Sequence, residues 1–421
     1  MTVKKALGLG ILCAFSLSGL ALAAPDSLDG HWRAAWMSSG GEIPVDLIIR
    51  TNPDGRLEAE VHNGPEVVRF SRVERRNGHV ELTIDHFECV ISADLSDDGK
   101  SMKGHWSKQT GGPNQMPFFA EKGDLDRFPK DRYPGPAKEA RIGNAGGTWR
   151  MRFEGDDYDS VCLFEQKGET LTGTIRAVDG DFRWLEGVYR NGRLLLSSFN
   201  GSWVFLFSAE LDDTGTLRGI WARGPRTPVK WTAVKEEATL PDAFGVTQLT
   251  NDERRLRFRY PSVEDPQRWV SPSDPAFAGK PVLIIFATTG CPNTHHMGAL
   301  ISELYKEYHP RGLNMLGVFN EFTKDVALIQ TRIRRFQKEY DLPFPFLYSL
   351  AMDKGEVGKE IPDFKAFLAW PTVAFIAADG KVAAIATGID GPATGPHYAE
   401  MAGQYRRRIE SLLSGDGGSI K

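Results

Sequence analysis

Residues 281–295 read PVLIIFATTGCPNTH, and this stretch decides the fold of the C-terminal third of the chain. Residues 281–286 form an uninterrupted apolar run, as expected of a central strand that is buried on both faces of a sheet. Cys291 follows this run and stands directly before Pro292, a residue type favoured at the first position of a helix. The stretch therefore predicts a buried strand that leads into a helix, with a cysteine at the junction.

The segments downstream continue this pattern of strands and helices. Apolar residues at helical spacing predict helices, and apolar runs bounded by turn residues predict strands. The predicted helices cover residues 299–308, 327–340 and 398–413, and the predicted strands cover residues 313–319, 372–378 and 381–388. The resulting order, β-α-β-α-β-β-α with a mixed sheet, is the thioredoxin arrangement, and we assign it to residues 261–414.

The front half of the chain contains an internal repeat. Residues 87–95 align with residues 202–211, and the Gly-x-Trp that begins at Gly30 recurs at Gly147. The dipeptide Asn-Gly, a strong hairpin signal, occurs at Asn77 and again at Asn191. Two units follow from this alignment, one over residues 28–123 and one over residues 145–236. A linker over 124–144 separates them, and a connector over 237–260 leads to the C-terminal domain.

Both repeat units have the pattern of β structure. Short segments rich in β-branched residues, such as 45–49 and 171–175, alternate with turn residues every 8–12 positions. We expect six to eight strands per unit, and closure into a small calycin-like barrel would remove exposed strand edges. One larger barrel shared by both units is the competing arrangement. The tryptophans of the repeats are expected in the cores rather than in a ligand site.

The first 23 residues have the pattern of a cleavable signal peptide. Lys4 and Lys5 provide a positive start, residues 6–20 are apolar, and small residues precede a cleavage site after Ala23. We therefore expect export to a bacterial periplasm, with no stable membrane span after processing. The formal net charge of the chain is −4, and loss of the two lysines makes it more negative by two. Proteins that bind nucleic acid are typically basic, so this negative charge argues against nucleic acid as a partner.

Residues 290–295, which read GCPNTH, carry a family resemblance together with the Trp370-Pro371-Thr372 step. They resemble the TlpA-type branch of thioredoxin-like proteins, which are periplasmic thiol:disulfide oxidoreductases of the redoxin (AhpC/TSA-like) kind. The resemblance implies that Pro371 is cis and that Trp370, Pro371 and Thr372 bind substrate. It extends to the β-rich region upstream. The second active-site cysteine of the family is replaced by Thr294, so cycling between two thiols within the motif is lost.

The candidate chemistry centres on Cys291. Free backbone amides and the dipole at a helix N-terminus favour a thiolate, and they can lower a cysteine pKa from about 8.5 to between roughly 3.5 and 7.5. Thr294 can donate a hydrogen bond to that thiolate. His295 follows Cys291 by four positions, so we expect it on the same helix face, as a proton handler. The predicted partners are protein or small-molecule thiols and disulfides, with an external reductant and without a cofactor.

Three questions stay open at this level. The assignment as an enzyme leans toward a monothiol oxidoreductase, but a non-catalytic binding or assembly protein is the main alternative. A one-cysteine peroxidase is the other, because Thr288 stands three residues before Cys291. A metal site is not expected, since spacing alone is weak evidence for one. Cys89 and Cys162 are expected as small core residues, with a disulfide between the repeats as the alternative.

Overall fold

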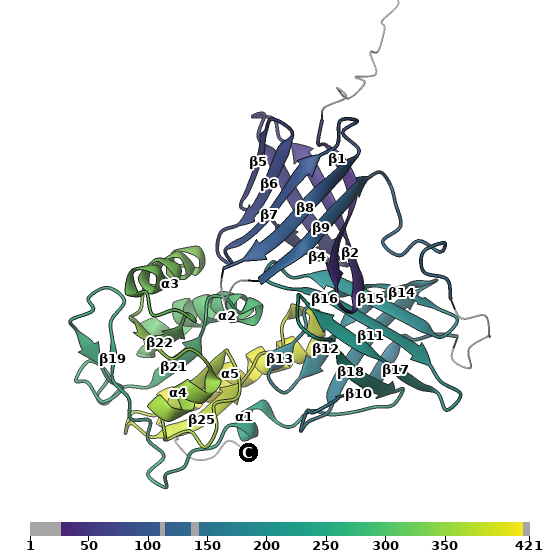
Figure 1. Cartoon of the computed structure of the whole chain (residues 1–421). Helices are drawn as coiled ribbons and strands as arrows, with labels where there is room; N and C mark the ends of the chain where they lie inside the picture. The colour runs from purple at the N-terminus through teal and green to yellow at the C-terminus, as the bar shows by residue number, and fades with distance from the viewer. Residues whose placement is uncertain (1–26, 110–113, 136–142, 416–421) are drawn as a thin grey trace, which may run out of the picture.

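The computed structural model describes residues 27–109, 114–135 and 143–415. Two β-rich domains precede an α/β domain, and the three bodies meet near the start of helix α2 (Figure 1). The predicted fold class, two barrel-like repeats followed by a thioredoxin fold with a mixed sheet, is confirmed. The predicted signal peptide lies outside the described residues, as does part of the predicted linker.

The first domain is an antiparallel sheet of nine strands, which we call the open barrel. Its order is β4-β3-β2-β1-β9-β8-β7-β6-β5, and no pairing joins β4 to β5 among the described residues. The expectation of six to eight strands in a closed barrel is therefore wrong here: charged side chains on both short end strands protect the two edges instead. The strands are β1 (Gly30–Ser38), β2 (Gly41–Thr51), β3 (Leu57–Asn63), β4 (Glu66–Arg69), β5 (Arg72–Arg76), β6 (His79–Ile84), β7 (Cys89–Leu95), β8 (Ser101–Lys108) and β9 (Asn114–Lys122).

The second domain, which we call the closed barrel, contains nine further strands. Pairing of β11 with β12 closes eight of them into a ring, and the two-residue β13 pairs with β12 outside that ring. Nine strands again exceed the predicted number, because β13 is too short to leave a signal in the sequence. The strands are β10 (Gly147–Phe153), β11 (Ser160–Lys167), β12 (Thr170–Ala177), β13 (Gly180–Asp181), β14 (Leu185–Arg190), β15 (Arg193–Phe199), β16 (Val204–Leu211), β17 (Thr216–Arg223) and β18 (Val229–Val234).

The two barrels have the same buried tryptophan and the same kind of hairpin turn at equivalent positions. Trp32 and Trp149 are fully buried, and the indole N–H of each donates to the carbonyl four residues earlier, at 2.9 and 2.8 Å. The Asn77–Gly78 and Asn191–Gly192 turns join the fifth and sixth strands of their sheets, with positive φ at all four residues. Positive φ at both central residues is the requirement of a type I′ hairpin. The repeat read from the sequence is therefore a repeat of structure.

The C-terminal domain has a five-stranded mixed sheet in the order β23-β22-β21-β24-β25. The strand β21 runs parallel to β22 and antiparallel to β24, and helices pack on both faces. The sequence analysis missed β23 and α4, which have four and seven residues. The elements are α1 (Ala243–Val246), β19 (Tyr260–Pro261), β20 (Trp269–Val270), β21 (Val282–Ala287), α2 (Pro292–Tyr308), η1 (His309–Arg311), β22 (Asn314–Asn320), α3 (Val326–Tyr340), β23 (Phe346–Ser349), α4 (Lys354–Glu360), β24 (Thr372–Ile376), β25 (Val382–Thr387), η2 (Pro392–Thr394) and α5 (Pro396–Ser414).

The two barrels are packed firmly against each other. Phe199 and Leu206 of the closed barrel belong to the same apolar cluster as the core of the open barrel. Between them lies Arg127, which is 7% exposed and forms ion pairs with Asp46 at 2.9 Å and Glu186 at 3.4 Å. Buried charge pairs of this kind restrict relative movement, since separating them leaves a charge without a partner.

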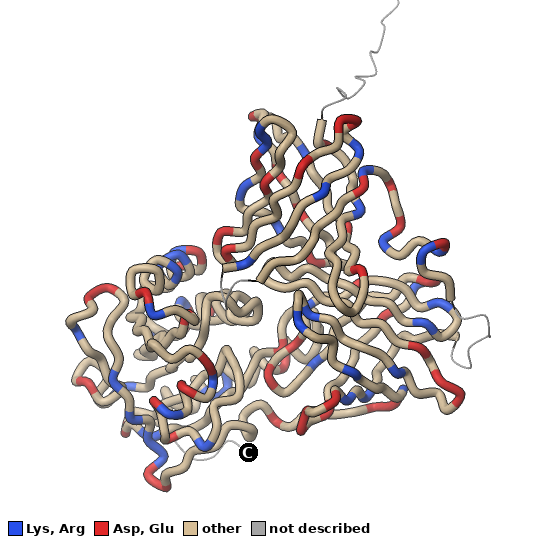
Figure 2. Tube along the Cα trace, viewed as in Figure 1, with Lys and Arg blue, Asp and Glu red and all other residues tan. Residues whose placement is uncertain are grey.

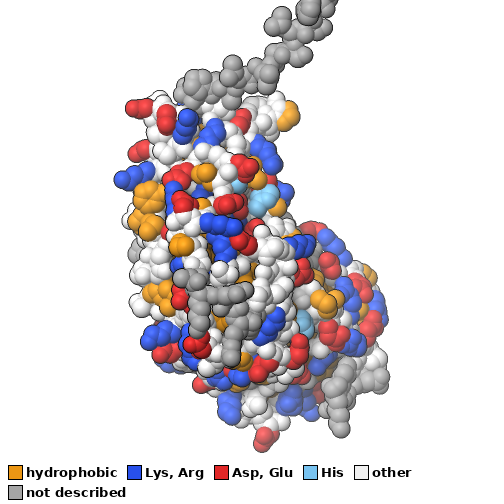
Figure 3. All heavy atoms as spheres, turned by 90° about the vertical axis from the view of Figure 1, so that its right-hand side faces the viewer, with side chains coloured by type: hydrophobic (Ala, Val, Ile, Leu, Met, Phe, Trp, Pro, Cys, Tyr) orange, Lys and Arg blue, Asp and Glu red, His pale blue; other side chains and the backbone are white. Residues whose placement is uncertain are grey.

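The outer surface carries charges of both signs. Blue and red segments alternate along all three domains (Figure 2), and the face of the barrels that is turned toward the viewer in Figure 3 shows scattered charged and apolar side chains. Among the described residues, no helix combines the length and the apolar character needed to cross a bilayer.

Candidate functional site

Cys291 lies where the sequence analysis placed it, between β21 and α2. Its backbone is extended, with φ −93° and ψ 121°, and it serves as the N-cap residue of α2, with Pro292 inside the first turn. The side chain is partly accessible, and its thiol donates to the carbonyl oxygen of Trp370 at 3.5 Å. This contact holds the cysteine against the segment that precedes β24.

The Trp370–Pro371 peptide bond is cis, as the resemblance implied. Pro371 is buried, and its carbonyl oxygen accepts from the Gly388 amide at 2.9 Å. Thr372 is fully buried, and its hydroxyl donates to the Ala369 carbonyl at 2.8 Å. Of the three residues predicted to bind substrate, only Trp370 therefore reaches both the thiol and the cavity described below.

The Cys291 thiol does not have the lowered pKa expected from its helix terminus. Burial raises the pKa above its ordinary value, although the amides of Asn293 and Thr294 and the Thr294 hydroxyl act in the opposite direction. The Thr294 hydroxyl oxygen is buried, and no hydrogen-bond partner is found for it among the described residues. Desolvation disfavours the charged form of a thiol, so the resting state is a neutral thiol with a hydroxyl beside it.

His295 faces a different neighbour from the one predicted. Its Nδ1 lies 2.9 Å from the Tyr340 hydroxyl and its Nε2 lies 2.9 Å from the Thr289 carbonyl. A carbonyl only accepts, so Nε2 carries the proton and Nδ1 accepts from Tyr340. Burial moves the pKa of His295 well below its usual value. Because Cys291 is an extended N-cap residue and not part of the helix, the spacing of four does not bring the imidazole over the thiol.

The imidazole of His295 instead packs against the open barrel. Its ring centroid lies 4.7 Å from those of His86 and Phe87. Potential metal-ligating atoms of His86, His295 and Glu339 all lie within 4.8 Å of one another. Both nitrogens of His295 are nevertheless engaged in hydrogen bonds, so a metal would have to displace Tyr340. The arrangement is that of a neutral contact between domains rather than an open metal site.

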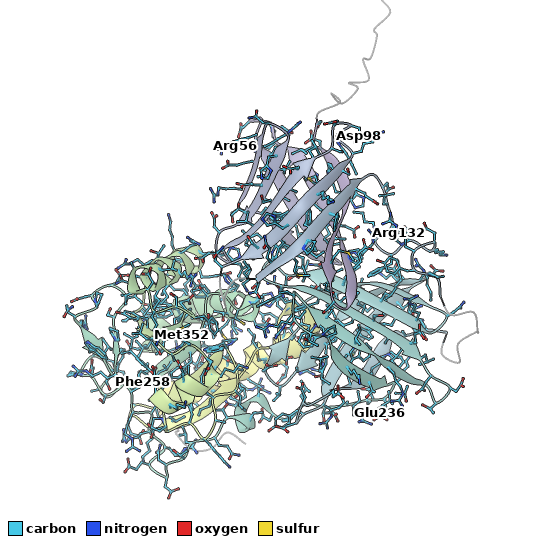
Figure 4. All side chains as sticks on the ribbon, in the orientation of Figure 1. Arg56, Asp98, Arg132, Glu236, Phe258 and Met352 are labelled. Carbon is cyan, nitrogen blue, oxygen red and sulfur yellow. The ribbon has the colours of Figure 1, made fainter. Side chains whose placement is uncertain are left out.

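Cys291 lines a cavity of about 740 Å³ between the C-terminal domain and the closed barrel. The wall from the C-terminal domain includes Phe322, Trp370 and Met352, the last of which is labelled in Figure 4. The opposite wall is aromatic and comes from the closed barrel: Phe153, Phe182, Trp203, Phe205 and Trp221. The tryptophans of the repeats are expected in the cores. Trp106 is fully buried, whereas Trp203 and Trp221 pack against the core of the closed barrel and also remain partly exposed in this cavity.

The closed barrel is held over Cys291 by contacts with Gly290, the residue before it, and with Asn293, two residues after it. The Ser202 hydroxyl donates to the Gly290 carbonyl at 3.1 Å, and the Asn293 amide donates to the Asp181 carbonyl at 3.0 Å. The Gly391 amide donates to the carboxylate of Asp181 at 2.9 Å. These bonds join segments that lie 88, 112 and 210 residues apart in the sequence, and they leave the thiol facing the cavity.

Lys108, from the end of β8 in the open barrel, completes the site. It is 2% exposed, and its ammonium group donates to the Ser202 hydroxyl at 2.5 Å and lies 4.0 Å from the centre of the Trp203 ring. Burial lowers its pKa to about 8. The sequence analysis missed Lys108, and one signal was available: a lysine occupies an inward position of a strand in which Met102 and Trp106 alternate with polar residues.

The three cysteines of the described chain are all free. Cys89 lies in the core of the open barrel and Cys162 in the core of the closed barrel, so the alternative of a disulfide between them is wrong. Burial raises the pKa of Cys89 to about 12, and it raises that of Cys162 as well. Cys291 is therefore the candidate nucleophile among the described cysteines.

A mixed sheet with a cysteine at the start of its first helix and a cis-proline segment against that cysteine defines a thioredoxin-fold domain. The family model described as Redoxin matches residues 244–401, so the C-terminal domain of this chain is a redoxin-family domain. No match to the chain was found among the curated proteins.

Solved structures give further likenesses. A thioredoxin-family thiol:disulfide interchange protein from Chlorobium tepidum TLS is 15% identical, with a TM-score of 0.29, over 39% of this chain and 98% of that one. A secreted disulfide oxidoreductase from Mycobacterium tuberculosis is 18% identical, with a TM-score of 0.28, over 38% and 100%. A thiol-disulfide oxidoreductase from Bacteroides fragilis NCTC 9343 is 22% identical, with a TM-score of 0.27, over 36% and 99%.

Proposed function

We propose that this protein exchanges small-molecule thiols and disulfides through Cys291, acting as a single reactive cysteine inside the cavity. The observation that carries this proposal is the position of the thiol, which starts α2, contacts the carbonyl of Trp370 and lines a cavity of about 740 Å³. The match of the C-terminal domain to the redoxin family supports such chemistry. Thr294 is proposed to stabilise the thiolate when it forms, since its hydroxyl has no other partner among the described residues.

The reaction needs two exchange steps. The Cys291 thiol releases its proton to solvent, and the thiolate attacks one sulfur of a small disulfide, R–S–S–R. A bond forms between Cys291 and one S–R group, while the second group leaves as R–S⁻ with the electron pair of the broken bond. A small thiol, as its thiolate, then attacks the S–R sulfur of the mixed disulfide. The two form a new small disulfide, and Cys291 leaves as a thiolate that takes a proton from solvent. That external thiol replaces the cysteine whose position Thr294 occupies.

Small molecules are favoured over proteins as substrates because the closed barrel covers the thiol. Ser202 and Asp181 contact residues on either side of Cys291, at 3.1 and 3.0 Å. A folded polypeptide would have to displace these contacts, whereas a small disulfide fits the cavity. The roles first expected for Pro371 and Thr372 in binding a peptide then become structural, in keeping with their burial.

The test is adduct formation with 2-hydroxyethyl disulfide, a neutral reagent, followed by intact-mass measurement. We expect one adduct in the wild-type protein and none in Cys291→Ser. Because the pKa of Cys291 is raised, the rate of adduct formation should increase about tenfold per pH unit above pH 7. Release of the adduct by added 2-mercaptoethanol completes the cycle. A protein that stays unmodified through pH 9 would contradict the proposal.

A second candidate function is favoured by the burial of the thiol. Burial keeps Cys291 in its neutral form, which suits a ligand-binding protein that uses the thioredoxin fold only as one wall of its cavity. In that case the cavity would hold a ligand without any adduct at Cys291. The peroxidase alternative rests on the position of Thr288, whose side chain is buried and whose hydroxyl accepts from the Gly290 amide at 3.4 Å. Consumption of hydrogen peroxide by the purified protein tests it.

We propose that the protein works in the periplasm after removal of residues 1–23. The support is the sequence pattern alone: Lys4 and Lys5, an apolar stretch, and small residues before Ala24. Expression of the full chain in a bacterium, followed by osmotic release and intact-mass measurement, tests this. We expect a released product that begins at Ala24. Recovery of the uncut chain with the membranes or the cytoplasm would contradict it.

A further inference from the structure

Three cationic side chains gather around one tryptophan in the wall of the cavity. The ammonium group of Lys108 lies 4.0 Å from the centre of the Trp203 ring, and the guanidinium carbons of Arg223 and Arg226 lie 5.6 and 5.3 Å from it. Arg223 also lies 5.1 Å from the centre of the Trp221 ring. All five side chains line the cavity that contains Cys291.

Carboxylates balance these cations only from a distance: Asp179 acts to raise the pKa of Arg223, but it forms no ion pair with it. Across the described ranges, none of Lys108, Arg223 and Arg226 takes part in an ion pair within 4.0 Å. Burial, and in addition the repulsion by Arg226, lowers the pKa of Arg223 to about 10. Lys108 is buried, Arg223 is partly buried and Arg226 is exposed. Buried charges are ordinarily paired, so a buried lysine beside two arginines without ion pairs indicates an anion that arrives from outside.

The wall also contains a cluster of aromatic side chains. Phe182 stands at the centre of a cluster in which its ring centroid lies 5.2 Å from that of Trp221 and 5.7 Å from that of Phe205. Cavities for small organic ligands combine such surfaces with a few charged groups that fix the orientation. Asp156, Asp179 and Asp181 also line the cavity. Asp156 and Asp179 are exposed, Asp179 faces Lys354 at 3.7 Å, and the Asp181 carboxylate accepts from the Gly391 amide.

The cations are also connected to the reactive cysteine. Lys108 donates to the Ser202 hydroxyl, which in turn donates to the carbonyl of Gly290, the residue before Cys291. An anionic group bound at Lys108 would thus sit close to the thiol, with an apolar body extending toward Trp221.

We propose that the cavity binds a small organic disulfide, or its thiol, that carries carboxylate groups on an aromatic or apolar body. This inference rests on the proposed exchange at Cys291 for the sulfur of the ligand, whereas the anionic and aromatic character rests on the cavity alone. Lys108, Arg223 and Arg226 bind the carboxylates, and Trp203 and Trp221 contact the body.

A pair of aromatic disulfides tests the charge preference. Dithiobis(2-nitrobenzoate) carries two carboxylates, and dithiodipyridine is neutral at pH 7. We expect Arg223→Gln to slow the reaction of Cys291 with the first reagent about tenfold and with the second less than about twofold. Arg223→Lys should retain most of the preference. The matched control is Arg218→Gln on the same strand, whose side chain is 61% exposed outside the cavity.

Ligand binding to a variant that cannot react tests the anion site independently of the proposed exchange. In Cys291→Ser, dithiobis(2-nitrobenzoate) should still quench the tryptophan fluorescence, and Arg223→Gln in that background should weaken the binding about tenfold. Equal effects of Arg223→Gln and Arg218→Gln on both reagents would overturn the anion preference, even if exchange occurs. Binding to Cys291→Ser without any adduct in the wild type would instead support the cavity while removing the exchange.

Discussion

At the scale of single residues, the position of Cys291 could be predicted from the residues around it, but its pKa could not. A helix N-terminus and a following proline are local features, so the position of the cysteine could be predicted from the sequence. Its pKa also depends on burial, which no nearby residue encodes, and burial moves the pKa in the opposite direction from the one predicted from the helix terminus. The same holds for His295, whose partner Tyr340 lies 45 positions away.

Thr294→Val should raise the pKa of Cys291 further. The substitution keeps the shape of the side chain but removes the hydroxyl, which is one of the groups that lower this pKa. A hydrogen bond to a charged group contributes about 1.5–3 kcal/mol, so the shift should reach roughly one pKa unit. The pH dependence of the rate of iodoacetamide alkylation measures it. An unchanged profile would show that the hydroxyl does not face the thiolate.

The neutral state of His86 should make the molecule sensitive to acid. Burial lowers its folded-state pKa to about 4, so as the pH falls below about 6.5 the unfolded chain binds a proton that the folded chain does not. Stability is then lost between about pH 6.5 and pH 4. His86→Phe keeps a ring beside Phe87 and removes the titration. Urea unfolding at pH 7 and pH 4.5 should show a smaller acid loss for His86→Phe, and identical losses would contradict this.

At the scale of elements, the turn between β12 and β13 packs on the end of β25. Gly388 has φ +71°, and a Cβ added there would lie 2.7 Å from the carbonyl carbon of Asp179. Gly312 has φ +103°, but its added Cβ would meet nothing within 4 Å. Both glycines are therefore conformationally required, while only Gly388 is also pressed against the closed barrel.

Gly388→Ala should loosen the closed barrel from the C-terminal domain. Both Gly388→Ala and Gly312→Ala place alanine in left-handed backbone, at a cost of about 1–2 kcal/mol each, but only the first also clashes with another domain. We expect Gly388→Ala to speed the reaction of Cys291 with a polyethylene-glycol maleimide about tenfold, and Gly312→Ala to leave it unchanged. Equal rates in both variants would mean that this contact does not restrict access.

Elements that repeat or alternate were predictable, whereas the contacts between them were not. The Gly-x-Trp and Asn-Gly signals recur because each sheet needs the same tryptophan anchor and the same type I′ turn. The bond from Ser202 to Gly290 joins positions 88 residues apart, and neither residue type is unusual for a loop. The cavity arises from such contacts, so the sequence predicted its cysteine but not the cations and aromatic rings opposite.

At the scale of the whole molecule, we expect the arrangement of the domains to act as a filter that selects substrates by size. Ion pairs connect the C-terminal domain to both barrels: Arg332 to Glu88 in the open barrel, and Arg176 to Asp390 from the closed barrel at 2.7 Å. Arg332 is 5% exposed, and separating a buried pair costs about 3–5 kcal/mol. Access to Cys291 is therefore limited by domains that stay together, and not by the thioredoxin fold itself.

Thr294→Cys tests this filter directly, because it restores the family's second cysteine at the position where Thr294 now stands. We expect the variant to form a disulfide with Cys291 and, in the presence of dithiothreitol, to reduce 2-hydroxyethyl disulfide at least tenfold faster than the wild type. Reduction of insulin should rise far less, because the closed barrel lies over the motif. Adding Gly388→Ala should then increase insulin reduction while changing the small-disulfide rate little. If Thr294→Cys alone reduces insulin and the small disulfide equally well, the closed barrel does not select substrates by size.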